Sequence, residues 1–177
     1  MTTARNHPRI TAADARAAVT LTVNGTPERL DVEPRRSLAD VLRRDLGLAG
    51  TQLGCDQGTC GSCTLLVDGA AVRSCLMLCV EADESRIETV EGLADDDGPL
   101  SELQTAFSEH HALQCGFCTA GFLMIATALL RDGLPLARDE VRALLAANLC
   151  RCTGYTPIVE AVASVADRHG LLIGDPS

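Results

Sequence analysis

The stretch GCDQGTCGSC at residues 54–63 constrains the fold of this 177-residue chain more than any other part of the sequence. Its three cysteines and the next one along the chain have the spacing C-x4-C-x2-C-x11-C, and they are Cys55, Cys60, Cys63 and Cys75. Four further cysteines have the unlike spacing C-x2-C-x31-C-x-C, and they are Cys115, Cys118, Cys150 and Cys152. Each set can supply four thiolates to one metal centre. Two such centres in one small chain indicate electron transfer.

The first set has the C-x4-C-x2-C…C spacing of plant-type [2Fe-2S] ferredoxins. We expect Gly54, Gly58 and Gly61 to adopt positive φ and to let the backbone wrap tightly around a compact anion. Such a loop would point amide N–H groups at sulfur, and hydrogen bonds of this kind help to set the potential of a cluster. The ninth cysteine, Cys79, lies four residues beyond Cys75 and could compete with it as the fourth ligand.

Other uses of the cysteines fit the sequence less well. A disulfide framework needs an oxidising compartment, whereas the N-terminus has no apolar export segment and nine is an odd number of cysteines. Zinc ribbons usually pair two C-x2-C knuckles, and neither set does so. A Rieske centre would need histidines close to the cysteines of a set, and none of the four histidines forms such a pair. Iron-sulfur clusters are therefore favoured, with a zinc-bound interaction module as the alternative.

Composition and charge narrow the class of protein. Hydrophobic residues make up 46% of the chain, but it has one tyrosine, three phenylalanines and no tryptophan, so its cores must be aliphatic. The formal charge of −9 would become more negative with clusters bound, which disfavours nucleic acid and anionic membranes and favours docking to a basic partner. No apolar stretch reaches the roughly 20 residues of a membrane span, since the longest, around residues 122–130, is too short. We expect a soluble, cytoplasmic protein.

The N-terminal half has the pattern of a small sheet. Residues 1–18 are polar, carry no motif and are expected to form a flexible extension. Alternating apolar residues at 19–23 and 30–32 flank an Asn24-Gly25 turn and predict a hairpin. Ser37 can cap a helix that presents Leu38, Val41, Leu42 and Leu46 on one face, with Asp40 completing an approximate capping box. Residues 64–67, 71–74 and 87–90 predict further strands, so we expect a mixed sheet with one helix packed across it.

The C-terminal half has the pattern of a helical bundle. Helical spacing recurs at residues 100–107, 119–131 and 138–147, and a fourth helix is expected from Thr156 as N-cap and Pro157 to about residue 169. Cys115 and Cys118 lead into the second helix, while Cys150 and Cys152 precede the fourth. The positive ends of two helices would then face a negatively charged cluster. The fold class is therefore α+β, with a sheet followed by a small bundle.

Three motifs in this order resemble a known family. They are GCDQGTCGSC at residues 54–63, QCGFCTAG at 114–121 and NLCRCTGY at 148–155. The chain resembles the iron-sulfur (small) subunits of the molybdenum hydroxylases, which include xanthine dehydrogenase, aldehyde oxidoreductase and aerobic carbon monoxide dehydrogenase, over about residues 19–168. The resemblance implies a ferredoxin-like β-grasp domain at residues 19–92, a four-helix bundle domain with two-fold pseudosymmetry at residues 93–170, and a tail at residues 171–177.

The resemblance also implies partners. A large molybdopterin subunit would hydroxylate the substrate, and an FAD subunit would accept electrons, within a dimer of heterotrimers. Single electrons would leave the molybdenum centre through the Cys115/Cys118/Cys150/Cys152 cluster and pass through the Cys55/Cys60/Cys63/Cys75 cluster. This chain would carry electrons and perform no bond chemistry. A free-standing two-cluster carrier is the alternative that the same ligands would permit.

Individual roles follow from the same resemblance. Gln114 and Cys152 match the residues that contact the pterin in the family. The family's eleven-residue gap selects Cys75 as the fourth ligand, and Cys79 is interpreted as a small buried hydrophobic residue. His110 and His111 lie close to Cys115 and could move protons there, but they are interpreted as residues that end a helix.

Overall fold

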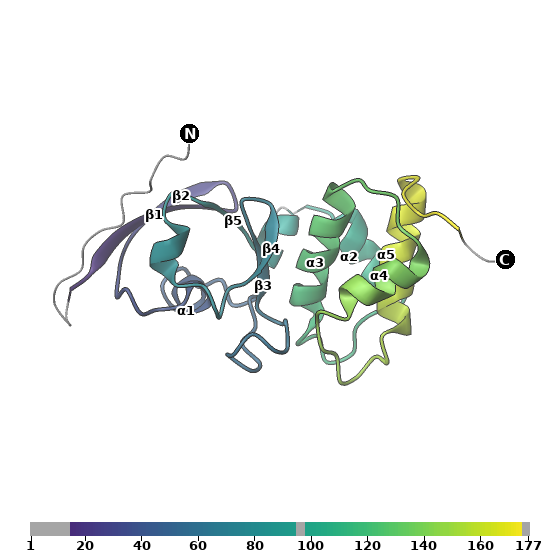
Figure 1. Cartoon of the computed structure of the whole chain (residues 1–177), viewed down its shortest axis with the longest axis horizontal. Coiled ribbons are helices and arrows are strands. Elements are labelled where there is room, and N and C mark those ends of the chain that lie inside the picture. The colour runs from purple at the N-terminus through teal and green to yellow at the C-terminus, as the bar shows by residue number, and fades with distance from the viewer. Residues whose placement is uncertain (1–14, 95–97, 175–177) are drawn as a thin grey trace.

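A computed structural model describes residues 15–94 and 98–174 of the chain. Of the expected N-terminal extension, residues 1–14 lie outside the described residues, as do residues 175–177 of the expected tail. Figure 1 shows a sheet with one short helix in one half of the molecule and a group of longer helices in the other. Each half has its own hydrophobic core. The chain is therefore of the α+β class, as the sequence predicted.

The N-terminal half contains a five-stranded mixed sheet. Its strands are β1 (Ala17–Val23), β2 (Thr26–Val32), β3 (Thr64–Val67), β4 (Ala70–Arg73) and β5 (Arg86–Glu88), in the order β2-β1-β5-β3-β4. β1 and β5 are parallel, and the other neighbours are antiparallel. The predicted hairpin is confirmed, since Val23 pairs with Thr26 across Asn24 (φ 48°) and Gly25 (φ 83°). Two positive φ values in a two-residue turn match the twist of the strands.

One helix, α1 (Leu38–Arg44), packs on this sheet. Ser37 caps it as predicted, because its Oγ accepts a hydrogen bond from the Asp40 amide at 3.1 Å. The apolar side chains on one face of the helix are completely buried against the sheet. Cys79 begins a short 3₁₀ helix, η1 (Cys79–Ala82), and is 0% exposed in the same core. Its interpretation as a small buried hydrophobic residue is confirmed.

The C-terminal half contains four helices around a second core. They are α2 (Glu102–Glu109), α3 (Thr119–Arg131), α4 (Arg138–Leu145) and α5 (Thr156–Arg168). The expected cap of the last helix was wrong, because Tyr155 is the N-cap and Thr156 is already helical. The reason lies in the preceding turn, where Gly154 (φ 70°) and Tyr155 (φ 71°) are both left-handed. A parallel bridge between Leu136 and Leu172 was not predicted.

The two halves meet where α3 packs against β3 and β4 (Figure 1). A second 3₁₀ helix, η2 (Val90–Leu93), leads from the sheet to the helices, and Val90 and Leu93 pack on the second core. An ion pair between Arg131 on α3 and Glu88 on β5, at 2.7 Å, also joins the halves. This packing brings the loop after α1 and the loop between α4 and α5 to the same side of the molecule. None of the described helices is long and apolar enough to cross a membrane.

Candidate metal centres

The four cysteines of the first set meet as two pairs. The backbone N–H of Cys60 donates to Cys55 Sγ at 3.2 Å, and the two thiols are also hydrogen-bonded to each other. The Cys75 thiol is hydrogen-bonded to Cys63. Ser74 fixes this second pair, because its hydroxyl donates to the Cys63 carbonyl oxygen at 2.7 Å. The loop and the end of β4 thus bring all four thiols together.

The surroundings of these thiols affect their charge in opposite ways. Backbone amides of Cys60 and Gln57 donate to Cys55 and lower its pKa to about 7. Burial raises the pKa of Cys75 to about 11. A thiol that coordinates a metal is deprotonated outright, so a bound cation would overcome the cost of a buried thiolate at Cys75.

The second set is arranged in the same manner. The Sγ atoms of Cys115 and Cys152 lie 3.6 Å apart, and the Cys118 thiol is hydrogen-bonded to Cys150. Cys118 is the N-cap residue of α3, and burial raises its pKa to about 12. Thr153 donates twice to Cys150 Sγ, from its amide at 3.4 Å and from its hydroxyl at 3.1 Å. Hydrogen bonds to sulfur are therefore available at this site too.

The spacing of these thiols fits a thiolate-bound cluster. Two sulfurs on one tetrahedral metal, each at about 2.3 Å, lie about 3.8 Å apart, close to the 3.6 Å between Cys115 and Cys152. Each set contains two pairs of neighbouring thiols, which is one pair for each iron of a [2Fe-2S] centre. The paired thiols thus fit a binuclear group.

The glycines of the first loop behave partly as predicted. Gly58 (φ 77°) and Gly61 (φ 80°) adopt the left-handed conformation. The same expectation for Gly54 was wrong, since its φ is not positive. A Cβ at Gly54 would lie 3.1 Å from Cys60 Sγ and 3.2 Å from the Phe117 ring. Glycine is needed here for space around a thiol and for an approach by the other half of the molecule.

The two sets of cysteines adjoin one another. The backbone N–H of Leu149, next to Cys150, donates to the carbonyl oxygen of Cys60 at 2.8 Å. A pocket of about 370 Å³ is lined by cysteines of both sets, namely Cys60, Cys115, Cys118, Cys150 and Cys152. The hydrogen bond from Leu149 to Cys60 thus links the cysteine loop of the sheet half to the cysteine loop of the helical half.

Sequence reasoning missed several residues that shape the second site. The Tyr155 hydroxyl accepts from the Cys150 amide at 3.0 Å, and its ring packs edge-on against Phe122 with centroids 6.4 Å apart. Asn148 is 1% exposed, and its Nδ2 has no hydrogen-bond partner among the described residues. Asn148, Thr153 and Tyr155 all lie in the quoted stretch at 148–155, so the motif was recognised but the individual functions were not.

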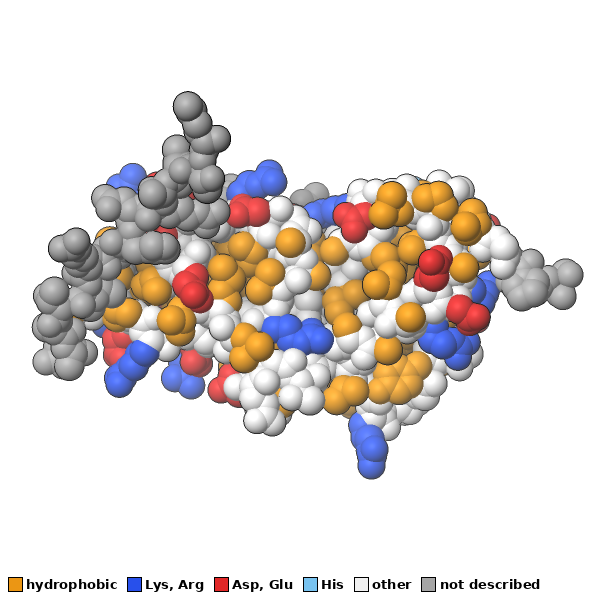
Figure 2. Space-filling model, in the orientation of Figure 1, with side chains coloured by type: hydrophobic (Ala, Val, Ile, Leu, Met, Phe, Trp, Pro, Cys, Tyr) orange, Lys and Arg blue, Asp and Glu red, His pale blue; other side chains and the backbone are white. Residues whose placement is uncertain are grey.

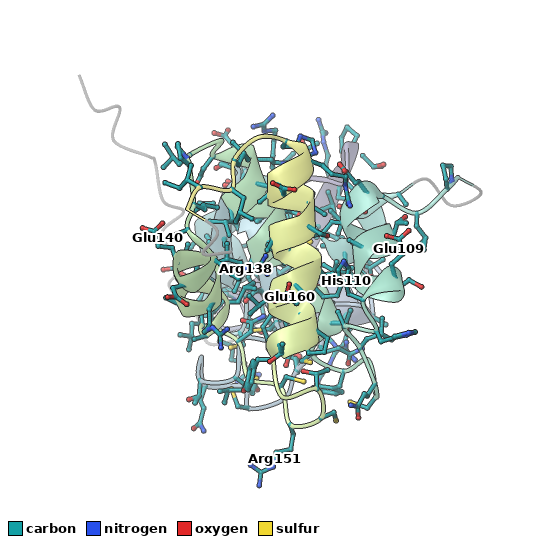
Figure 3. All side chains as sticks on the ribbon, turned by 90° about the vertical axis from the view of Figure 1, so that its right-hand side faces the viewer. Glu109, His110, Arg138, Glu140, Arg151 and Glu160 are labelled. Atoms are coloured by element: carbon teal, nitrogen blue, oxygen red, sulfur yellow. The ribbon has the colours of Figure 1, made fainter. Side chains whose placement is uncertain are left out.

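The edge of the second site faces solvent. Gln114, Cys115 and Cys152 are all exposed, and so is Arg151. Figure 3 shows Arg151 pointing away from the helices at this end of the molecule. His110 is the C-cap residue of α2 and His111 follows it with φ 52°, which agrees with their interpretation as residues that end a helix. Figure 3 shows His110 away from the loop that carries Arg151.

One half of the chain is a sheet with a glycine-rich cysteine loop, and the other half is a group of helices that holds a second set of paired thiols. This combination defines an iron-sulfur protein with two cluster-binding units. Residues 21–94 match the 2Fe-2S iron-sulfur cluster binding domain family, and residues 89–163 match the [2Fe-2S] binding domain family. The chain therefore contains two [2Fe-2S] binding domains.

Similar proteins identify the family. The chain is 54% identical to the nicotine 6-hydroxylase small subunit of Paenarthrobacter nicotinovorans, over 88% of this chain and 93% of the relative. It is 50% identical to the caffeine dehydrogenase subunit gamma of Pseudomonas sp. (strain CBB1), over 84% of this chain and 90% of the relative. It is also similar to a chain of quinoline 2-oxidoreductase from Pseudomonas putida 86, with 50% identity, a TM-score of 0.82, and coverage of 89% of this chain and 99% of that chain.

The chain belongs to the family of iron-sulfur subunits of the molybdenum hydroxylases. It is an electron-transfer subunit of an oxidoreductase, and the substrate chemistry occurs on a partner subunit. The resemblance drawn from the three cysteine motifs is thereby confirmed.

Proposed function

We propose that this chain relays single electrons from a molybdopterin-binding large subunit to an FAD-binding subunit. The observation that carries the proposal is the pair of adjoining thiol sets, joined by the hydrogen bond from Leu149 to Cys60 at 2.8 Å. A separate carrier of one electron at a time would need only one such centre. Two centres held at a fixed separation suit a relay between two different cofactors.

The proposed ligands are the eight paired cysteines, namely Cys55, Cys60, Cys63 and Cys75 for one group and Cys115, Cys118, Cys150 and Cys152 for the other. Each [2Fe-2S] group, when bound, takes up and releases one electron. The contribution of the protein is to hold the thiols in pairs, to donate hydrogen bonds to sulfur, and to exclude water from the inner thiols. Cys63 and Cys118 are 2% and 9% exposed, in contrast to the exposed Cys115 and Cys152.

We infer the direction of the relay from the exposure of the two sets, because Cys115 and Cys152 of the second set are exposed whereas no cysteine of the first set is. The exposed edge of the second set carries Gln114 and Cys152, which we propose contact the pterin of the large subunit. Apolar side chains surround this edge, since Leu113, Phe117 and Leu149 are 42%, 44% and 51% exposed. Figure 2 shows hydrophobic side chains at the surface of both halves on the face that it draws. A partner that covers Gln114 and Cys152 would bury these leucines and Phe117.

The finer architecture and assembly belong to the same proposal. We assign residues 19–92 to a β-grasp domain and residues 93–170 to a four-helix bundle domain, which are supported by the separate cores and the two matched families. The complex would be cytoplasmic and built as a dimer of heterotrimers. The named relatives are subunits of a nicotine 6-hydroxylase and of a caffeine dehydrogenase, so substrate choice would lie in the molybdenum-bearing subunit.

Purification of the native complex tests this proposal. The chain should copurify at high salt with a larger subunit that contains molybdenum, and it should hold about four irons. A red-brown chain that elutes alone at high salt would instead indicate a free-standing carrier. A colourless chain with zinc and no absorption above about 400 nm would refute cluster binding altogether.

A further inference from the structure

Arg73, the last residue of β4, touches both cysteine-bearing loops. Its Nε donates to the Gly58 carbonyl oxygen at 2.8 Å, in the loop of the first set. Its Nη1 lies 3.0 Å from Thr64 Oγ1, next to Cys63. On the other side, the same guanidinium donates to Asn148 Oδ1 at 3.4 Å and to the Ala147 carbonyl oxygen, just before Cys150. Arg73 thus bonds a residue that lies 75 positions from it in the sequence, as well as residues of the first cysteine loop.

The sheet determines where this guanidinium lies. Arg73 pairs with Thr64 across β3 and β4, so its side chain starts beside the end of the first cysteine loop. Arginine presents several donors in a rigid, planar fork, which allows one group to bind carbonyl oxygens on two sides. The side chain is partly buried, so its charge is less screened by solvent than that of a surface arginine.

The second loop has little freedom around this contact. Asn148 is buried, and a Cβ at Gly61 would lie 1.8 Å from its Oδ1. A Cβ at Gly121 on α3 would lie 2.5 Å from the Gly61 carbonyl oxygen. The backbones are therefore in close contact here, and Arg73 donates hydrogen bonds to the two residues that Gly61 approaches, Ala147 and Asn148.

We propose that Arg73 is a positioning residue that fixes the separation of the two cluster-bearing loops and raises the reduction potential of both bound clusters. This inference rests on the proposed function, because it requires both thiol sets to hold clusters. Each cluster gains one negative charge on reduction, and a neighbouring cation favours the more negative state. The hydrogen bonds of the planar guanidinium fix the distance between the two loops, whereas its positive charge raises the reduction potentials of the clusters. Substitutions that remove one property and keep the other therefore distinguish the two effects.

The test uses the full chain in its native complex with three variants. Arg73→Met removes both the fork and the charge, whereas Arg73→Lys keeps the charge and loses the fork. Arg131→Met is the matched control. Arg131 also joins the two halves, but it does so through an ion pair with Glu88 at 2.7 Å and not through the residues that Arg73 contacts.

Potentiometric EPR titration reports the potentials, and the magnetic interaction between the two reduced clusters reports their separation. Arg73→Met should make reduction of both clusters about three- to tenfold less favourable, which is about 30–59 mV. Arg73→Lys should stay within about twofold, or about 18 mV, while both Arg73 variants should change the magnetic interaction. Arg131→Met should leave potentials and interaction unchanged. Native potentials and interaction in Arg73→Met, with full iron content, would overturn the proposal.

Hydrogen exchange at the Leu149 amide, compared between Arg73→Met and Arg131→Met after iron has been removed from both, gives a readout that does not depend on cluster loading. This amide should exchange about tenfold faster or more in Arg73→Met than in Arg131→Met, because a charged hydrogen bond no longer holds residues 147–148. If Arg73→Met loses iron, equal exchange in the two variants overturns the positioning role and faster exchange supports it. Failure of the proposed function has a different signature, since the native complex itself would then lack molybdenum or fail to be reduced by substrate.

Discussion

Replacement of Gly61 by alanine measures how closely the two halves of the chain are fitted together. Gly61 has φ 80°, and an alanine in this left-handed conformation costs about 1–2 kcal/mol. The new Cβ would also lie 1.8 Å from Asn148 Oδ1 and 2.9 Å from the Ala147 carbonyl oxygen. Overpacking of this kind costs about 1–3 kcal/mol. We therefore expect a total destabilisation of about 2–5 kcal/mol.

Gly69 is the matched control for this variant. It has φ 87° in the turn between β3 and β4, but a Cβ there would meet nothing within 4 Å. Gly69→Ala should therefore cost only the conformational part, about 1–2 kcal/mol. In thermal unfolding of the full chain, followed by circular dichroism, Gly61→Ala should melt about 2–12 °C below Gly69→Ala. Melting temperatures of the two variants within about 1 °C of each other would refute the close fit at Asn148.

Three further variants address cluster binding, tuning and pH. Cys60→Ala should lose the first cluster and destabilise the sheet half together, because a half of this size depends on metal ligation; an unchanged melting profile after iron loss would contradict this coupling. Thr153→Val should lower the potential of the second cluster by on the order of 20–40 mV, whereas Thr153→Ser, which keeps the hydroxyl near Cys150, should not. Glu102 is exposed, and its hydrogen bond with His169 holds its pKa below the usual value. The stabilisation from ionised Glu102 is therefore complete above the unfolded pKa of about 4.3 and is lost as the pH falls through the folded pKa. At pH 7 the melting temperature of Glu102→Gln should lie below that of the native chain by up to about 2 °C. At acid pH the two melting temperatures should be equal.

Local features of the fold were predictable from the sequence because neighbouring residues determine them. The Asn24-Gly25 turn, the Ser37 cap and the bounds of β3 and α3 follow from turn chemistry, capping and periodicity, and the structure has them where they were expected. Cysteine spacing similarly predicted two groups of thiols, which the structure brings together within each set.

Features that depend on packing between the halves were not predictable from local patterns. Arg73 and Asn148 lie 75 positions apart, and neither has a sequence signal for the other. Gly54 was expected to provide a positive φ. Its lack of a side chain instead leaves space for Cys60 Sγ and for the ring of Phe117, which belongs to the other half. Tyr155, and not Thr156, is the N-cap of α5, because the turn before the helix has positive φ at Gly154 and Tyr155. Arg73, Asn148 and the function of Gly54 were thus missed because they depend on contacts between the two halves.

EPR spectroscopy of the native complex during reduction by its own substrate tests the central claim most directly. The relay predicts two distinct [2Fe-2S] signals, each from one electron, because the two proposed ligand sets, Cys55 to Cys75 and Cys115 to Cys152, would bind separate clusters in different surroundings. Both signals should appear with substrate as the only reductant. A complex that shows one signal or none after full reduction of the molybdenum centre would contradict the account.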